Sequence, residues 1–114
     1  RYILRYSLST AWDISTASYD GDSARLYVQT QESSPSGFCF KSDGTRLYLG
    51  GTSGKDINQY DLSTAWDLST ASFDTTFFVG GLETWPTGVF FKPDGEKFYT
   101  VGRNGDCVAA WTIT

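Results

Sequence analysis

The chain has 114 residues, with 9 Lys and Arg, 13 Asp and Glu and no His, which gives a net charge of −4. This mildly acidic balance argues against a nucleic-acid partner, because nucleic-acid binders carry a basic surface. No apolar run approaches the ~20 residues of a membrane-spanning helix. Without His, neither a Ser-His-Asp nor a Cys-His catalytic site can be built from this chain alone.

Aromatic residues make up 17% of the sequence, and there are 12 Gly. Aromatic side chains favour strands and Gly favours tight turns. The composition therefore predicts short strands joined by turns, and no helical periodicity contradicts this.

An internal repeat dominates the sequence. Residues 6–20 read YSLSTAWDISTASYD and residues 60–74 read YDLSTAWDLSTASFD, which are identical at twelve of fifteen positions. Residues 35–62 and 86–113 match at nine of twenty-eight positions. The spacing is 54 residues for the first pair and 51 for the second, so three extra residues are expected between Asp20 and Pro35. A period near 50 residues is typical of a four-stranded repeat unit.

Four strands, here A to D, can be assigned within each unit. Strands A and B are joined through Asp-Gly, which suits a hairpin turn because Gly adopts positive φ at little cost. The expected A and B strands are Gly37–Phe40 with Arg46–Gly50, and Gly88–Phe91 with Lys97–Val101. Strand C is expected at Ile3–Leu8, Ile57–Leu62 and Val108–Ile113, and strand D at Ala17–Thr30 (broken by Gly21) and Ala71–Val79.

These strands divide the chain into three parts. Residues 1–34 form a partial unit with strands C and D, residues 35–85 a complete unit, and residues 86–114 a partial unit with strands A to C. The incomplete units predict either a piece of a longer repeat protein, which we favour, or several copies assembled into a ring.

The sequence of the repeat resembles that of YVTN-type β-propeller proteins, which are large repetitive proteins of bacteria and bacterial viruses. The resemblance rests on Pro-x-Gly-hydrophobic-x-Phe-Lys-x-Asp-Gly-x-x-hydrophobic-Tyr, followed by YDLSTAWDLSTA. It implies an all-β fold of four-stranded antiparallel blades that stack face to face, with strand A lining a central channel. It also implies that ligands bind on the face that carries the B–C and D–A connections. Function does not follow from this fold.

Two recurring turn residues are expected to be structural. Trp12 and Trp66 lie in the C–D turns, and we interpret each as a latch that packs onto an adjacent strand rather than as a sugar platform. Asp13 and Asp67 are expected to accept backbone N–H bonds in these turns. Asp20-Gly21-Asp22 is interpreted as a turn rather than a cation site.

The candidate ligand site comprises Trp85, Arg103, Asn104 and Glu83, on the face of the B–C and D–A connections. Trp85 has no aromatic counterpart at Ser34, so it is the best candidate to stack on a sugar or anchor a partner. The interpretation we favour is nonetheless structural: Trp85 plugs the channel or packs on Leu82. Glu32 and Glu83 are interpreted as exposed linker carboxylates with no catalytic role.

We therefore expect a non-catalytic module for protein interaction or scaffolding in a larger extracellular or virion assembly. A lectin-like propeller is the first alternative, and part of a propeller enzyme is the second. The expected partners are neighbouring blades, from the same chain or from identical subunits, and a glycan in the lectin alternative. No cofactor or metal is expected, and two cysteines, Cys39 and Cys107, are interpreted as free thiols, with a disulfide between them as the alternative.

Overall fold

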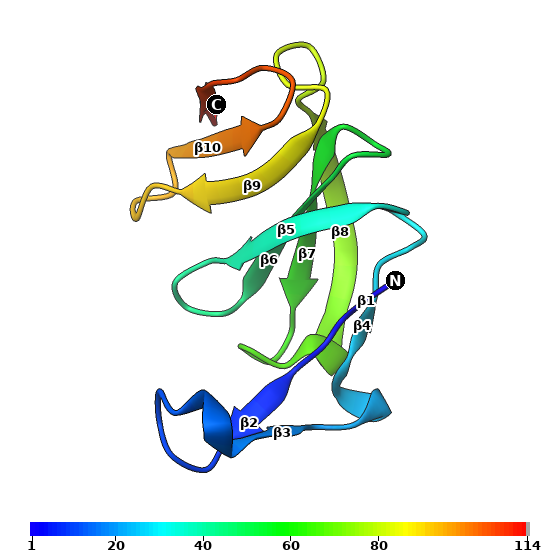
Figure 1. Ribbon diagram of the computed structural model, residues 1–114, viewed down its shortest axis with the longest axis vertical. Coiled ribbons are helices and arrows are strands. Elements are labelled where there is room, and N and C mark those ends of the chain that lie inside the picture. The colour runs from blue at the N-terminus through cyan, green and yellow to red at the C-terminus, as the bar shows by residue number, and fades with distance from the viewer. Residues whose placement is uncertain (114) are drawn as a thin grey trace.

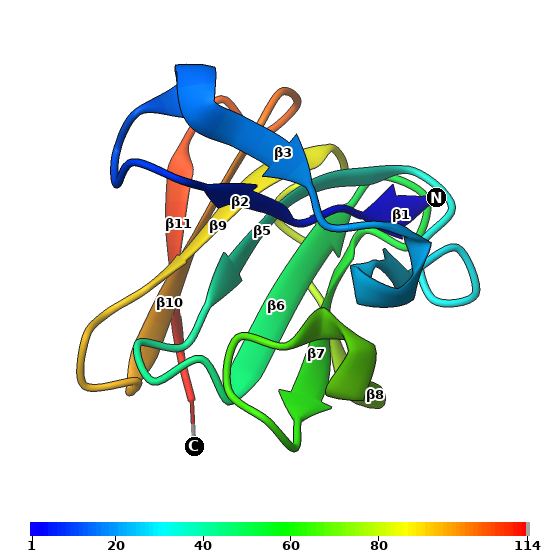
Figure 2. The ribbon, with the colours of Figure 1, turned by 90° about the horizontal axis from the view of Figure 1, so that it is seen from below.

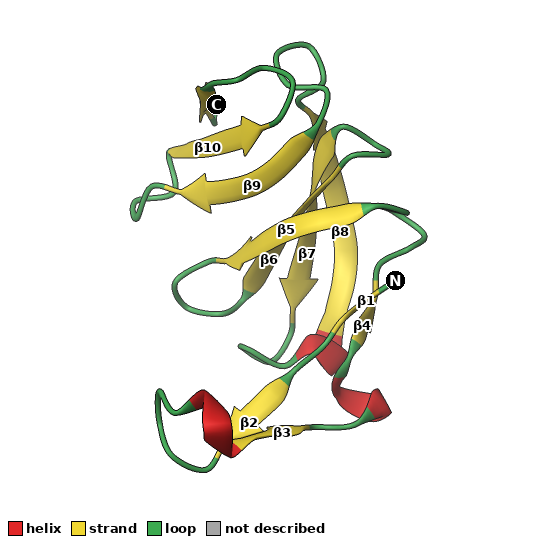
Figure 3. Ribbon diagram, in the orientation of Figure 1, coloured by secondary structure: helices red, strands yellow, loops and turns green. Residues whose placement is uncertain are grey.

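The computed structural model describes residues 1–113, which form an all-β structure of antiparallel sheets joined by turns and three one-turn 3-10 helices (Figures 1 and 3). Among these residues, none forms a helix with the length and apolar character needed to cross a bilayer.

The central sheet is four-stranded, in the order β5-β6-β7-β8. Its strands are β5 (Pro35–Phe40), β6 (Arg46–Gly51), β7 (Asp56–Leu62) and β8 (Ala71–Phe78), with the 3-10 turn η3 (Leu68–Thr70) before β8. The strands expected within residues 35–85 are thus confirmed. A bulge at Gln59/Tyr60 shifts the pairing of β7 with β8, which increases the local twist.

A second sheet follows, in the order β9-β10-β11. Its strands are β9 (Pro86–Phe91), β10 (Lys97–Gly102) and β11 (Val108–Thr112). In both sheets an Asp-Gly turn joins the first strand to the second. The turn glycines, Gly44 and Gly95, have the same positive φ of 76°. The Asp43 and Asp94 carboxylates accept the N–H of the residue two positions on, at 2.9 and 3.0 Å, which closes each turn.

The N-terminal part departs from the sequence prediction. The expected break of Ala17–Thr30 at Gly21 is confirmed, but the strand expected at Ile3–Leu8 is also split, so two small sheets form in place of one long pair. The elements are β1 (Tyr2–Ile3), β2 (Tyr6–Leu8), η1 (Ile14–Thr16), β3 (Ala17–Tyr19), η2 (Asp22–Ala24) and β4 (Leu26–Tyr27). The η2 turn lies where three extra residues were expected, and it interrupts the ladder between β3 and β4 after Gly21, whose φ is 94°.

Figure 2 shows how the sheets follow one another in space, and two apolar clusters lie between them. One cluster joins β6 and β7 to the N-terminal part and includes the buried Leu47, Tyr60 and Val28. The other joins the four-stranded sheet to the three-stranded sheet and includes Tyr48 and Phe98. The Tyr48 ring stacks on Phe91 across this second interface, with centroids 3.9 Å apart. Burial of apolar side chains on both faces explains why the central strands are apolar on both sides.

The first strands of the two sheets approach closely. Ser36 Oγ donates to the Pro86 carbonyl at 2.7 Å, and a Cβ atom on Gly37 would lie 2.7 Å from the Thr87 carbonyl oxygen. Such close backbone contact requires Gly at position 37, so this recurrent Gly marks the point where the sheets converge.

Candidate functional site

Glu83 lies at the centre of the predicted ligand site, but it faces the backbone and not the solvent. Its side chain is 2% exposed. Oε1 accepts the backbone N–H of Trp85 at 2.7 Å and of Asn104 at 3.2 Å, and Oε2 accepts that of Gly105 at 2.7 Å. Burial acts to raise the pKa of the Glu83 carboxyl, but these three N–H groups outweigh it and hold that pKa below its ordinary value.

Glu32 forms the same arrangement one repeat earlier. Its side chain is 1% exposed. Oε1 accepts the N–H of Ser34 at 2.6 Å and of Ser53 at 3.2 Å, and Oε2 accepts that of Gly54 at 3.0 Å. Each carboxylate therefore clamps the linker that precedes a sheet to the loop between the second and third strands of that sheet.

Recurrent glycines make room for these carboxylate clamps. A Cβ atom on Gly51 would lie 2.1 Å from the Glu32 side chain, and one on Gly102 would lie 2.3 Å from the Glu83 side chain. These separations are far below van der Waals contact, so each clamp requires a residue without a Cβ at that position. This requirement explains why Gly51 and Gly102 occupy the same position in the two repeats.

The interpretation of Glu32 and Glu83 as exposed linker carboxylates was therefore wrong. Each Glu precedes a Pro by three residues, Pro35 and Pro86, and each repeat carries the same Gly pair. That shared spacing was the signal for a buried carboxylate that accepts loop N–H groups. It was missed because burial cannot be read from a linker that is polar in sequence.

The structure brings the four predicted site residues together. The Arg103 guanidinium lies over the Trp85 ring at 5.3 Å from its centroid, and the Arg103 N–H donates to the Trp85 carbonyl at 3.2 Å. Asn104 Nδ2 donates to Thr84 Oγ1 at 2.8 Å. Trp85 is 43% exposed, and Arg103 and Asn104 are exposed. Glu83 differs from the other three residues, because it is buried and its carboxylate already accepts three backbone N–H groups.

The latch expected at Trp66 is confirmed. Its N–H donates to the Gly44 carbonyl at 3.0 Å, and its ring lies over the Gly44 backbone and 5.0 Å from the Phe40 centroid. The prediction of a latch at Trp12 was wrong, because the Trp12 side chain is fully exposed and no hairpin among residues 1–113 lies against it. The Asp13 and Asp67 carboxylates accept the N–H groups of Ser15 and Ser69 at 3.0 Å, as expected.

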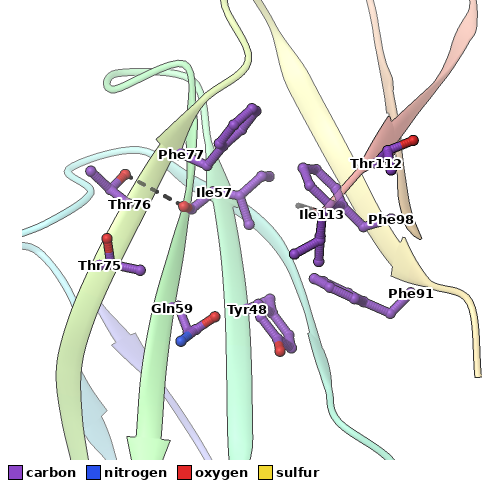
Figure 4. A pocket seen from close by; sticks show the side chains of 10 residues that line it. All are labelled: Tyr48, Ile57, Gln59, Thr75, Thr76, Phe77, Phe91, Phe98, Thr112 and Ile113. Carbon is purple, nitrogen blue, oxygen red and sulfur yellow. Dashed lines mark hydrogen bonds between the residues drawn. The ribbon is translucent and has the colours of Figure 1, made fainter. Parts of the chain in front are cut away.

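An apolar cleft opens between the two larger sheets, at the edges formed by β8 and β11 (Figure 4). Its volume is about 290 Å³. Phe77, Ile57, Phe91 and Phe98 project into it from both sides. Its polar lining consists of Gln59 and three threonines, Thr75, Thr76 and Thr112.

Neither a disulfide between the cysteines nor a cation site at the Asp20-Gly21-Asp22 turn, the two alternatives left open by the sequence, is present among residues 1–113. Cys39 and Cys107 are both free, and burial raises the pKa of the Cys39 thiol to about 11. Asp20 pairs with Arg5, and Asp22 pairs with Arg25, in the turn that the sequence predicted there. Within the part of the chain that the structure describes, no cluster of three or more His, Cys, Asp or Glu side chains is placed to hold a metal.

Comparison with known proteins returned no match, either among protein-family models or among curated proteins.

Proposed function

We propose that the chain is a non-catalytic β-propeller module of the YVTN type, which acts as a scaffold or interaction unit within a larger extracellular or virion assembly. In this proposal the four-stranded sheet β5–β8 is one complete blade, and its neighbours are partial blades. The first strands converge through Gly37 and Ser36, as strands beside a central axis would, while the β8 and β11 edges leave a cleft between them.

The observation that carries the proposal is the pair of carboxylate clamps. Glycosidase chemistry uses a pair of carboxyl groups, and Glu32 and Glu83 are the pair that the two linkers provide. Both are buried and bonded to loop N–H groups. Carboxylates used in this way repeat a structural joint from one unit to the next, and a scaffold needs such recurrence.

Insertion of a second copy of residues 35–85 directly after residue 85 tests the proposal. In a stack of repeats each unit is stabilised by its neighbours, so total stability grows with the number of units. We expect the longer chain to unfold in one cooperative step at a higher urea concentration. A matched control inserts the same residues and carries Glu83→Gln in both copies, which removes the clamp on each side of the insert. An insert that unfolds separately, or that lowers the urea midpoint, contradicts the proposal.

Carbohydrate binding is a second candidate function, favoured by the exposed Trp85 ring and the exposed polar side chains of Arg103 and Asn104 beside it. An aromatic face with adjacent polar groups can stack on and hydrogen-bond a sugar. The test is a glycan array with the wild type, Trp85→Ala and the control Leu82→Ala. Binding that is lost only with Trp85→Ala supports this function, and an array without signal for the wild type contradicts it.

A further inference from the structure

One turn sequence occurs twice and lies in two unlike environments. In the second copy, Trp66 covers the Asp43-Gly44 turn, and Leu68 is buried at 3% exposure. In the first copy, Trp12 is 100% exposed and Ile14 is 86% exposed. The backbone is nonetheless the same, since φ is 66° at Trp12 and 67° at Trp66. The first copy therefore presents a preformed latch with nothing beneath it.

The surface that would accept such a latch is also present and uncovered. The Asp94-Gly95 turn has the conformation of the Asp43-Gly44 turn, with φ of 76° at both glycines. A Cβ atom on Gly44 would lie 2.4 Å from the Trp66 ring, whereas one on Gly95 would have no atom within 4 Å. Latch and acceptor are thus the two halves of a contact that this fold already makes once within the chain.

The open edge of β11 lies beside that acceptor. In the four-stranded sheet, β7 pairs with β8, and Asp61 lies opposite Ser72. The positions of β11 that correspond to β7 have no neighbour on this side among residues 1–113. Ile113, which corresponds to the buried Leu62, is 49% exposed at the edge of the apolar cleft. Exposed apolar side chains beside an unpaired strand edge favour addition of another strand.

We propose that the free edge of β11 binds the Ala17–Tyr19 strand of a second copy of this chain, with Trp12 of that copy seated on the Asp94-Gly95 turn. The inference rests on the proposed function, because it treats β11 of one copy and β3 of another as neighbouring strands of one blade. By the register of β7 with β8, Ser18 lies opposite Thr112 and Tyr19 opposite Trp111. Ile14 then packs beside Ile113, as Leu68 packs with Leu62.

The docked copy must release its own β2, because β11 takes the place that β2 holds beside β3. This pairing covers three residue pairs, all of them exposed. The ion pair of Arg5 with Asp20 is lost with it. By contrast, β11 is held firmly, because Trp111 stacks on Phe98 and its Nε1 donates to Thr100 Oγ1 at 3.0 Å. The contact joins unlike ends of two copies, so it builds rings or filaments rather than closed two-fold dimers.

Light scattering over a range of concentrations tests the inference with the full chain. We expect the wild type to associate as concentration rises, and Trp12→Ala to weaken that association by about tenfold or more. Gly95→Asn should weaken it similarly, because Asn tolerates positive φ and its side chain occupies the seat of the Trp12 ring. The control Leu82→Ala alters an exposed apolar side chain outside this contact and should leave association unchanged.

A crosslink defines the register. Ser18→Cys and Thr112→Cys are made in separate chains that both carry Cys107→Ser, and the two chains are mixed under mild oxidation. A disulfide between the two different chains is expected, while Ser18→Cys mixed with Ser72→Cys should give none. The native Cys39 thiol, with its pKa raised to about 11 by burial, reacts slowly.

A wild type that stays monomeric at every concentration overturns the inference, and so does association that neither Trp12→Ala nor Gly95→Asn weakens. Either result leaves the proposed function standing if the inserted copy of residues 35–85 still raises the urea midpoint. Failure of that insertion together with intact association counts against the blade architecture instead.

Discussion

At the scale of single residues, the two buried glutamates are the most informative feature of the molecule. Each carboxylate accepts three backbone N–H groups from two separate loops. Buried N–H groups that lose their acceptor cost about 1–3 kcal/mol, so a clamp of this kind fixes both loops. The exposed Trp85 and Asn104 are held in place by the Glu83 clamp, because Glu83 accepts the backbone N–H of each.

The glycine beside each clamp gives a prediction with a matched control. Gly102→Ala should lower the free energy of unfolding by about 1–3 kcal/mol, because the added Cβ overlaps the Glu83 side chain. Gly81→Ala lies in the same linker, where a Cβ meets no atom within 4 Å, and should be close to neutral. Urea denaturation of the two variants compares them, and equal stability would contradict the clamp.

The Glu83 carboxyl also predicts a pH dependence. Its pKa is below the ordinary value of 4.5 in the folded chain, so its contribution to stability is complete above about pH 4.5 and is lost as pH falls through the folded pKa. Glu83→Gln replaces one acceptor oxygen with an amide that faces the Gly105 N–H. We expect Glu83→Gln to be less stable than the wild type at pH 7, with a smaller difference at pH 3. The urea midpoints at both pH values measure this, with Glu96→Gln as an exposed control, and a difference that does not shrink would contradict the assignment.

At the scale of elements, the same turn is structural in one copy and free in the other. Trp66 covers the Asp43-Gly44 turn of its own sheet, whereas Trp12 has no such turn beneath it among residues 1–113. Local sequence therefore sets the shape of the turn, and the neighbouring hairpin decides whether the Trp side chain is packed.

These two tryptophans form a matched pair for a stability measurement. Trp66→Ala should lower the free energy of unfolding by about 1–2 kcal/mol, in keeping with a half-buried aromatic side chain. Trp12→Ala should change it little in dilute solution, where copies do not associate. Thermal or urea unfolding at low concentration measures both, and a Trp12→Ala variant as unstable as Trp66→Ala would refute the difference in environment.

The elements also show how far sequence reasoning reaches. The strands of residues 35–62 and 86–112 were predictable, because the Asp-Gly turns and the apolar segments on both sides of them repeat in register. The break at Gly21 was also predictable from the Asp20-Gly21-Asp22 turn, whereas the split of Ile3–Leu8 into β1 and β2 was not, since no turn residue marks it. The site residues were placed on the correct loops, but the burial of Glu32 and Glu83 depends on the fold around those loops.

At the scale of the whole molecule, stability comes from neighbouring sheets that cover each other. The apolar clusters lie between sheets, at the N-terminal interface around Tyr60 and at the C-terminal interface around Tyr48. Large aromatic side chains remain exposed on both larger sheets, as at Phe78 and Phe90. A protein with such faces is suited to pack against further units, in keeping with the proposed scaffold role.

A double-mutant cycle across the sheet interface tests this stacking most directly. Tyr48 of β6 and Phe91 of β9 are stacked at 3.9 Å, so Tyr48→Ala and Phe91→Ala should be coupled by about 0.5–1.5 kcal/mol in the free energy of unfolding. Tyr48→Ala combined with Leu62→Ala, in the other apolar cluster, serves as the uncoupled control. Additive effects of Tyr48→Ala and Phe91→Ala would contradict the face-to-face packing of the sheets.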